Sequence, residues 1–377
     1  MHCPLDGNQA LCLALARPES MAERTPAEWT GLVAAARETS LLGALWDLAT
    51  IAGVAERLPE AAARHLYGGF LKADRNAEAI RWELQNLQSG MLQRLSPPLV
   101  LKGGAYLLAD LPNARGRICN DVDLLFPRED LDRAESLLFF EGWVTTHHDP
   151  YDQRYYREWM HELPPLQHWS RGTTLDVHHN ILPETFAVRT DPTRLIESAR
   201  DLPAPWRYRV LSPAHLVLHA IVHLFSETEW DRGLRDLYDI KVLLEHYGTR
   251  LGDPFWHDLV TEANNLGVDW LVAYAVDCCE QRLRADVPNE VREALMRGRN
   301  TGLKRAVASR VFMHGLNTRA SATPKRDSAA RALLFLRGHW LKMPPYLLAR
   351  HLFYKAFLAP KEDETNEPGD EEARRHG

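Results

Sequence analysis

The feature that most constrains the fold is a pair of carboxylates inside an apolar segment, Asp121-Val122-Asp123-Leu124-Leu125-Phe126. The apolar residues predict a buried strand. Alternate residues of a strand point to the same face, so Asp121 and Asp123 share one face with Cα atoms about 6.6 Å apart. Like charges side by side on a strand repel each other, and Asp is a poor strand former. Two interpretations remain open: a hydrated strand end, or a pair of metal ligands.

A glycine pair lies upstream of these carboxylates. Leu99-Val100-Leu101 predicts a short buried strand and Ala105-Tyr106-Leu107-Leu108 the start of a helix, which places Gly103 and Gly104 at the turn between them. Glycine lets the backbone approach a ligand, and the free N–H groups of a helix's first turn favour an anion. The pair is therefore either a phosphate-binding turn or an ordinary tight turn. Lys102 beside it either balances phosphate charge or points into water.

A third carboxylate follows on another predicted strand, at Asp176 in Thr173-Thr174-Leu175-Asp176-Val177-His178. By itself Asp176 could equally be a strand-end residue paired with an arginine. The order of glycine pair, Asp-x-Asp and single Asp is nevertheless the one that two-metal nucleotidyl transfer needs. Two carboxylates hold the metal ions that carry the triphosphate, and the third completes the coordination and accepts the acceptor's proton.

These motifs resemble those of the uncharacterised bacterial nucleotidyltransferase family of the polymerase-β-like superfamily. The segments that carry the resemblance are Leu101-Lys102-Gly103-Gly104-Ala105, Arg117, Asp121-Val122-Asp123-Leu124-Leu125, His161-Glu162-Leu163-Pro164-Pro165-Leu166 and Leu175-Asp176-Val177-His178. The resemblance implies that Asp121, Asp123 and Asp176 bind two Mg²⁺ ions. It also places the glycines in the nucleotide-phosphate loop. The wider superfamily usually has a Ser where this chain has Gly104 or Ala105, so one phosphate contact is missing.

Arginines and histidines give further candidates. Arg117 lies between the glycines and the Asp pair, where a guanidinium could bind the triphosphate or be an exposed loop residue. His215, His219 and His223 are four residues apart on a predicted helix, and we expect core or substrate-facing roles rather than a zinc site. On the next predicted helix Arg235 and Asp239 are spaced for a surface salt bridge; alternatively, Arg235 or Asp236 reaches the nucleotide.

The predicted order of elements favours an α+β fold: a small mixed β-sheet forms the nucleotidyltransferase core, between N-terminal and C-terminal helical regions. Changes in composition divide the chain into five predicted parts. These are an N-terminal helical region (1–95), the catalytic core (96–210), a helical domain (211–300), a basic amphipathic helical region (301–360) and a disordered acidic tail (361–377).

Charge is unevenly distributed, although the whole chain has a net charge of −6. Residues 301–360 contain eleven Lys or Arg against one acid, Asp327. Such a segment could bind RNA or an anionic membrane surface, or its basic side chains could pair with acidic neighbours. Five cysteines without zinc spacing, no long apolar run and no signal-peptide pattern favour a cytoplasmic protein without a transmembrane segment.

The sequence thus predicts an Mg²⁺-dependent nucleotidyltransferase that moves an NMP from an NTP, with ATP as the expected donor, and releases pyrophosphate. The expected nucleotide ligands are Lys102, Gly103, Gly104 and Arg117. The acceptor is open among a small molecule, a peptide, a protein and RNA. Two other classes remain as alternatives: a catalytically silent nucleotide sensor, and a protein that binds RNA or an anionic surface through residues 301–360.

Overall fold

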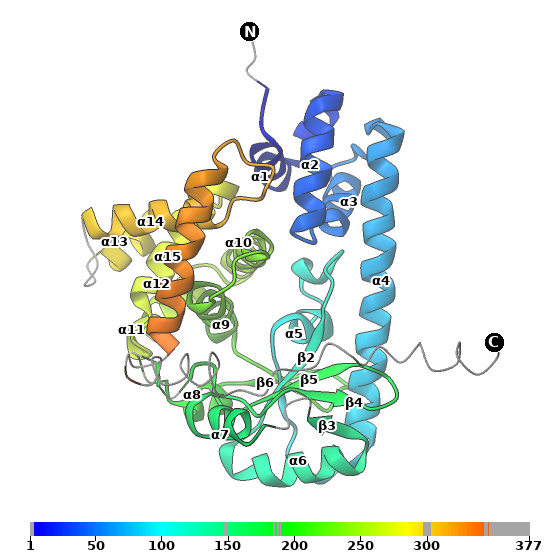
Figure 1. The fold of residues 1–377 in the computed structure, drawn as a ribbon, viewed down its shortest axis with the longest axis vertical. Helices are drawn as coiled ribbons and strands as arrows, with labels where there is room; N and C mark the ends of the chain where they lie inside the picture. Colours follow the sequence, from blue (N-terminus) through cyan, green and yellow to red (C-terminus); the bar gives the residue numbers. More distant parts are fainter. Residues whose placement is uncertain are drawn as a thin grey trace, which may run out of the picture.

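The computed structural model describes residues 4–145, 149–183, 185, 186, 188, 190–296, 303–342 and 346. Within that part of the chain, seven strands form one mixed sheet in the order β3-β4-β5-β2-β1-β7-β6. Helical regions lie before and after the sheet in the sequence and flank it in space (Figure 1). The predicted α+β class with a small mixed sheet is confirmed. The predicted acidic tail, 361–377, lies outside the described residues.

The strands are short, and most lie where the apolar pattern predicts them. Their bounds are β1 (Leu99–Val100), β2 (Asp121–Leu125), β3 (Trp143–Thr145), β4 (Leu166–His168), β5 (Thr174–His178), β6 (Arg200–Asp201) and β7 (Arg209–Val210). Strand β2 pairs in parallel with β5 and antiparallel with β1. Since β4 and β5 form a hairpin next to β2, the strand that carries Asp176 lies directly beside the strand of the Asp pair, as predicted.

The helices fall into three groups along the chain. The N-terminal group contains α1 (Gly7–Ala16), α2 (Pro26–Glu38), α3 (Leu42–Ile51) and α4 (Glu60–Ser89), with 3₁₀ turns at Pro18–Glu23, Ala55–Arg57 and Met91–Arg94. The helices among the strands are α5 (Lys102–Leu108), α6 (Leu131–Phe140), α7 (Pro150–Trp159) and α8 (Pro192–Glu197), with 3₁₀ turns at Pro112–Ala114 and Arg128–Asp130. The last group contains α9 (Pro213–Ser226), α10 (Gly233–Leu251), α11 (Asp253–Asn265), α12 (Asp269–Leu283), α13 (Asn289–Met296), α14 (Leu303–Gly315) and α15 (Pro324–Lys342).

The long helix α4 connects the N-terminal helices to the sheet and runs along one side of the molecule (Figure 1). Gly68 and Gly69 lie inside α4 and do not interrupt it, although glycine is unfavourable in the interior of a helix. A Cβ on Gly69 would lie 2.5 Å from the Cβ of Leu42, so the absent side chain lets α4 approach α3 closely. At the other end, buried Glu83 accepts hydrogen bonds from Arg171 and Thr173. Helix α4 is thereby fixed to the turn between β4 and β5.

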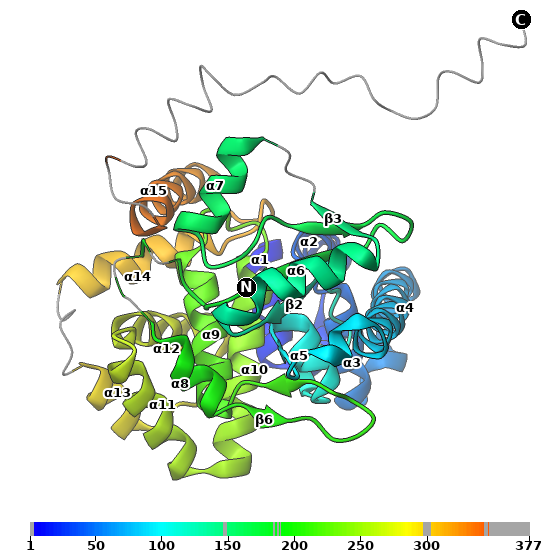
Figure 2. The same cartoon turned by 90° about the horizontal axis from the view of Figure 1, so that it is seen from below.

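The basic C-terminal region forms two helices, α14 and α15, that pack on α9 and α12 (Figures 1 and 2). Several of its cations have partners inside the protein. Arg305 pairs with Asp277 at 2.7 Å, Lys342 pairs with Glu227 at 3.4 Å, and Arg337 donates to the carbonyl of Phe225. The basic side chains of this region therefore serve in part to anchor its helices, while Lys304, Arg310, Arg319, Lys325 and Arg326 remain exposed. No described helix has the length and apolar character needed to span a bilayer.

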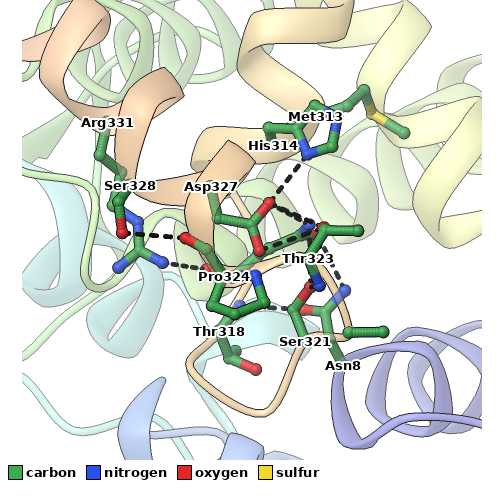
Figure 3. Close-up of polar contacts among 12 residues, drawn as sticks. Asn8, Met313, His314, Thr318, Ser321, Thr323, Pro324, Asp327, Ser328 and Arg331 are labelled. Atoms are coloured by element: carbon green, nitrogen blue, oxygen red, sulfur yellow. Dashed lines mark hydrogen bonds and ion pairs between the residues drawn. The ribbon is translucent and has the colours of Figure 1, made fainter.

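The turn between α14 and α15 holds the N-terminal helix α1 through a polar network that we call the terminal clasp: Asn8, His314, Asn317, Thr323 and Asp327. Figure 3 shows Asn8, His314, Thr323 and Asp327 of this network. Asp327 has no exposed surface and accepts hydrogen bonds from His314 Nδ1 at 2.8 Å, Asn317 Nδ2 at 2.9 Å and Thr323 Oγ1 at 3.1 Å. Asn317 Oδ1 in turn accepts from Asn8 Nδ2 at 2.9 Å. The two ends of the described chain are thus joined by buried hydrogen bonds.

Replacing Asp327 by Ala is expected to lower the free energy of unfolding by about 2 kcal/mol, because three donors of the terminal clasp lose their acceptor. Urea unfolding followed by circular dichroism measures the change. Ser328→Ala is the matched control: its exposed hydroxyl donates only to the carbonyl of Pro324, and we expect less than about 0.5 kcal/mol. Equal effects of the two substitutions would contradict the role assigned to Asp327.

Candidate active site

Three carboxylates lie together on the central strands. Asp121 and Asp123 are on β2, and in the parallel pairing Asp123 lies directly opposite Asp176 of β5. Asp123 is buried, with 1% of its surface exposed, whereas Asp121 faces a cleft. One carboxylate oxygen of Asp176, Oδ1, is buried and has no hydrogen-bond partner among the described residues. The sheet thus places side by side the three carboxylates that were selected from the sequence.

Asp123 is held by two cationic or polar partners. Lys102 Nζ lies 2.6 Å from Asp123 Oδ1, and His178 Nε2 lies 3.0 Å from the same oxygen. Burial by itself would raise the pKa of Asp123, but Lys102 and His178 outweigh it and lower the pKa well below its usual range. Asp123 is therefore ionised. Of the two interpretations of Lys102, the one in which it points into water is wrong, because this side chain pairs with Asp123 and is only 22% exposed.

The other two carboxylates respond differently to the same surroundings. Burial, followed by the negative charge of Asp123, raises the pKa of Asp121 and raises that of Asp176 to about 7. Carboxylates that crowd one another and lack donors destabilise their own charged forms, and a bound divalent cation relieves this. Oxygen ligands of this kind are those that Mg²⁺ prefers. Among the described residues, ligand atoms of Asp123, Asp176 and His178 lie within 4.8 Å of one another, and Asp121 lies outside that group. The carboxylates of Asp123 and Asp176, with the unpartnered Asp176 Oδ1, fit a magnesium site.

The raised pKa of Asp176 predicts a pH dependence of stability in the metal-free protein. The folded state binds the Asp176 proton more tightly than the unfolded chain, where the pKa is ordinary. The contribution of this proton to the free energy of unfolding is therefore present below about pH 4 and is lost as the pH rises through about 7. Asp176→Asn should remove it. We expect the variant to gain stability over wild type as the pH rises from about 4 to about 8. Thermal unfolding in EDTA across this range measures the difference, and a difference independent of pH would contradict the prediction.

A cleft of about 560 Å³ opens in front of Asp121, between α5 on one side and α9 and α10 on the other. Its lining includes Lys102, Gly103, Arg117, Asp121, His223, Arg232, Arg235 and Asp236. The two glycines differ in role. Gly103 lines the cleft, whereas a Cβ on Gly104 would lie 2.8 Å from Val100 Cγ2, so Gly104 allows α5 to pack on β1. Both lie inside the first turn of α5.

Arg117 lines the cleft but is anchored to the helical region. Its Nε donates to Asp239 Oδ2 at 2.9 Å, its guanidinium lies over the Tyr106 ring, and only 11% of its side chain is exposed. Asp239 also accepts from Asn113 Nδ2 at 3.2 Å. The interpretation of Arg117 as an exposed loop residue is therefore wrong. The prediction of a salt bridge between Arg235 and Asp239 is also wrong. Arg235 pairs with Asp236 at 2.6 Å, and Asp239 pairs with Arg117.

The three spaced histidines of α9 have separate surroundings. His215 is buried between Ser198 Oγ, 2.8 Å from its Nδ1, and Glu262 Oε2, 2.9 Å from its Nε2. His219 is buried, and burial lowers its pKa well below the usual range. His223 lines the cleft with Nδ1 3.7 Å from Glu227 Oε1. Among the described residues, the groups suited to a metal include none of the three, and the core or substrate-facing roles stay a prediction.

Sequence reasoning missed two residues beside the carboxylates and one in the cleft. His178 contacts Asp123, and Glu162 Oε2 lies 3.3 Å from His178 Nδ1. Arg232 lines the cleft next to the Asn120 amide. A signal for His178 was present, because it follows Asp176 by two residues and so shares its face of β5. Glu162 lies in one of the segments that carry the family resemblance, but no role was assigned to it. Nothing local marks Arg232, and both residues reach the site through the fold.

Comparison with known proteins agrees with this arrangement. The model of an uncharacterised nucleotidyltransferase family matches residues 25–284, which include the cleft and all three carboxylates. No curated protein and no solved structure matches the chain significantly. The match spans most of the chain and supports a role in nucleotidyl transfer, and the chain therefore belongs to this uncharacterised nucleotidyltransferase family.

Proposed function

We propose that the protein transfers a nucleoside monophosphate from an NTP to an acceptor, with Mg²⁺ held by Asp121, Asp123 and Asp176. The observation that carries the proposal is the meeting of these carboxylates on two adjacent strands, with Asp121 at the wall of a cleft, in a chain of a nucleotidyltransferase family. When bound, the metal ions would neutralise phosphate charge and polarise the reacting phosphorus.

The cleft offers a set of cations for the triphosphate. Lys102 and Arg117 approach it from the sheet side, and Arg232 and Arg235 from α10 and the turn before it. Guanidinium groups bind phosphate oxygens through two parallel hydrogen bonds. A Cβ on Gly103 would lie 2.5 Å from Arg117 Nη1, so this glycine makes room for the Arg117 guanidinium at the cleft. The salt bridge between Arg117 and Asp239 keeps one of these cations in place before the nucleotide binds, which lowers the cost of ordering it.

The chemical step moves one phosphorus between two oxygens. An acceptor oxygen attacks the α-phosphorus, the bond from that phosphorus to the bridging oxygen breaks, and pyrophosphate leaves with the electron pair. The acceptor's proton passes to a carboxylate oxygen of Asp176, the carboxylate whose Oδ1 has no hydrogen-bond partner among the described residues. Most of the rate enhancement would come from positioning and electrostatics.

The test is to incubate the purified chain with Mg²⁺ and each α-³²P-labelled NTP, ATP first, in a cell extract. Label is then measured separately on small molecules, peptides, protein and RNA. We expect label in one fraction, together with release of pyrophosphate. Nucleotide binding without pyrophosphate release would instead favour a catalytically silent sensor, and the absence of both would overturn the proposal.

A further inference from the structure

A second cluster of possible metal ligands lies behind the carboxylates and contains nitrogen: His161, Glu162 and His178. Its position is fixed by the backbone. Glu162 and His178 face each other across an antiparallel bridge, the Leu163 amide donates to the Val177 carbonyl at 2.8 Å, and the His179 amide donates to the His161 carbonyl at 2.9 Å. One possible ligand atom from each of His161, Glu162 and His178 lies within 4.8 Å of the others. The cluster is thus rigid and compact.

Hydrogen bonding around His178 leaves one ring nitrogen in conflict with its neighbour. Its Nε2 lies 3.0 Å from Asp123 Oδ1, so in the neutral ring the single proton belongs on Nε2. The lone pair of Nδ1 then faces Glu162 Oε2 at 3.3 Å, where two acceptors oppose each other. His178 Nδ1 is buried, and it makes no hydrogen bond within the described part of the chain. A cation between these two atoms would remove the conflict.

His161 likewise has a ring nitrogen without a hydrogen-bond partner among the described residues. Its Nδ1 is also buried and forms no hydrogen bond with any described residue, and its ring centre lies 5.3 Å from that of His178. A buried nitrogen without a hydrogen-bond partner is costly, so two of them in one compact cluster require an explanation. A second proton on His178 would satisfy Glu162 but would leave His161 without a partner. A metal ion bound by all three side chains satisfies every one of these atoms.

We propose that His161, Glu162 and His178 bind one divalent transition-metal ion of the Zn²⁺ class. Two imidazoles and one carboxylate are a ligand set that such ions accept, with a further position left for water or substrate. Asp123 would orient His178 from behind, as carboxylates commonly do for metal-bound imidazoles. The site shares His178 with the neighbouring group of Asp123, Asp176 and His178, and differs from it in its second imidazole. It does not depend on nucleotidyl transfer.

The experiment is a calorimetric titration of the full chain, freed of metal with EDTA, with Zn²⁺ alone. We expect one Zn²⁺ per chain, bound at least about 100-fold more weakly by His161→Ala. His257→Ala removes an exposed imidazole from α11 and should bind as wild type does. No binding by wild type, or equal binding by His161→Ala and wild type, would overturn the proposal.

Two further measurements locate the metal. Asp121→Asn removes a carboxylate of the magnesium site, and we expect it to retain Zn²⁺. Loss of Zn²⁺ in Asp121→Asn with retention in His161→Ala would place the ion on the aspartates and overturn the proposal. X-ray absorption of the Zn²⁺ complex should show scattering from imidazole rings, and oxygen ligation alone would count against it.

Folding and the nucleotidyl reaction are tested separately. Thermal unfolding shows whether His161→Ala is folded. If it is not, Glu162→Gln carries the test, because its side chain is 19% exposed and the isosteric change keeps its shape; it too must bind Zn²⁺ more weakly. Label transfer from NTP is read in the metal-free chain with Mg²⁺ alone, so its failure bears on the proposed function and leaves the Zn²⁺ result standing.

Discussion

Asp121→Asn is expected to reduce nucleotidyl transfer by about 10³-fold or more, while the protein stays folded. Asn has the shape of Asp but lacks the charge that holds the cation. Asp121 faces the cleft, and its pKa is raised by burial and by Asp123, so removing its charge relieves repulsion in the metal-free protein. The rate of pyrophosphate release at saturating NTP and Mg²⁺ measures the loss, and thermal unfolding checks the fold.

The control for this prediction is Asp132→Asn, which removes an exposed carboxylate from α6, outside the cleft lining. We expect its rate to stay within about twofold of wild type, since exposed charges outside such a site have small effects. Full activity of Asp121→Asn would overturn the assignment of the magnesium site. A loss of activity that follows a loss of folding would leave Asp123→Asn to decide, with rate and unfolding measured in the same way.

Asp239→Ala is expected to lower the free energy of unfolding by about 3–5 kcal/mol, the usual cost of leaving a buried charge without its partner. Asp239 and Arg117 expose only 5% and 11% of their side chains, and Asn113 loses its acceptor as well. Because Arg117 also lines the cleft, we expect weaker NTP binding in addition to lower stability. Urea unfolding and equilibrium binding of a labelled NTP measure the two effects.

Glu78→Ala is the control, on an exposed pair. Glu78 pairs with Arg75 at 3.0 Å on α4, and 58% and 82% of their side chains are exposed. Such pairs contribute about 0.3–0.5 kcal/mol, so this variant should unfold almost as wild type does. If Asp239→Ala cost no more than Glu78→Ala, the link between α10 and the loop that carries Arg117 would have no structural role.

Local patterns predicted the strands that carry the carboxylates and the helices that carry the cleft residues. Helix α7 lies in an aromatic and charged stretch for which we predicted no element, although Asp149 caps its start by accepting from the Tyr151 amide at 2.9 Å. Strands β6 and β7 contain two residues each and exist only through pairing with each other and with β1. Elements that short have no periodicity to read.

The sequence by itself determined the elements that carry the carboxylates and the face they share, because the alternation of a strand and the burial of its apolar residues are local properties. Only the tertiary structure decided the partners of the charged side chains. Lys102 and Asp123 are 21 residues apart, His178 and Asp123 are 55 apart, and Arg117 and Asp239 are 122 apart.

The physical reason is that a charged side chain pairs with the opposite charge that folding brings close to it in the most buried surroundings. Spacing along one helix favoured Arg235 for Asp239, at a gain of a few tenths of a kcal/mol. Because α10 packs against the loop after α5, Asp239 instead pairs with the buried Arg117. Desolvation of this pair strengthens the attraction between the two charges and makes either charge costly without its partner. The residue pattern along the chain determines the direction in which each side chain points, and tertiary packing determines which residues it contacts.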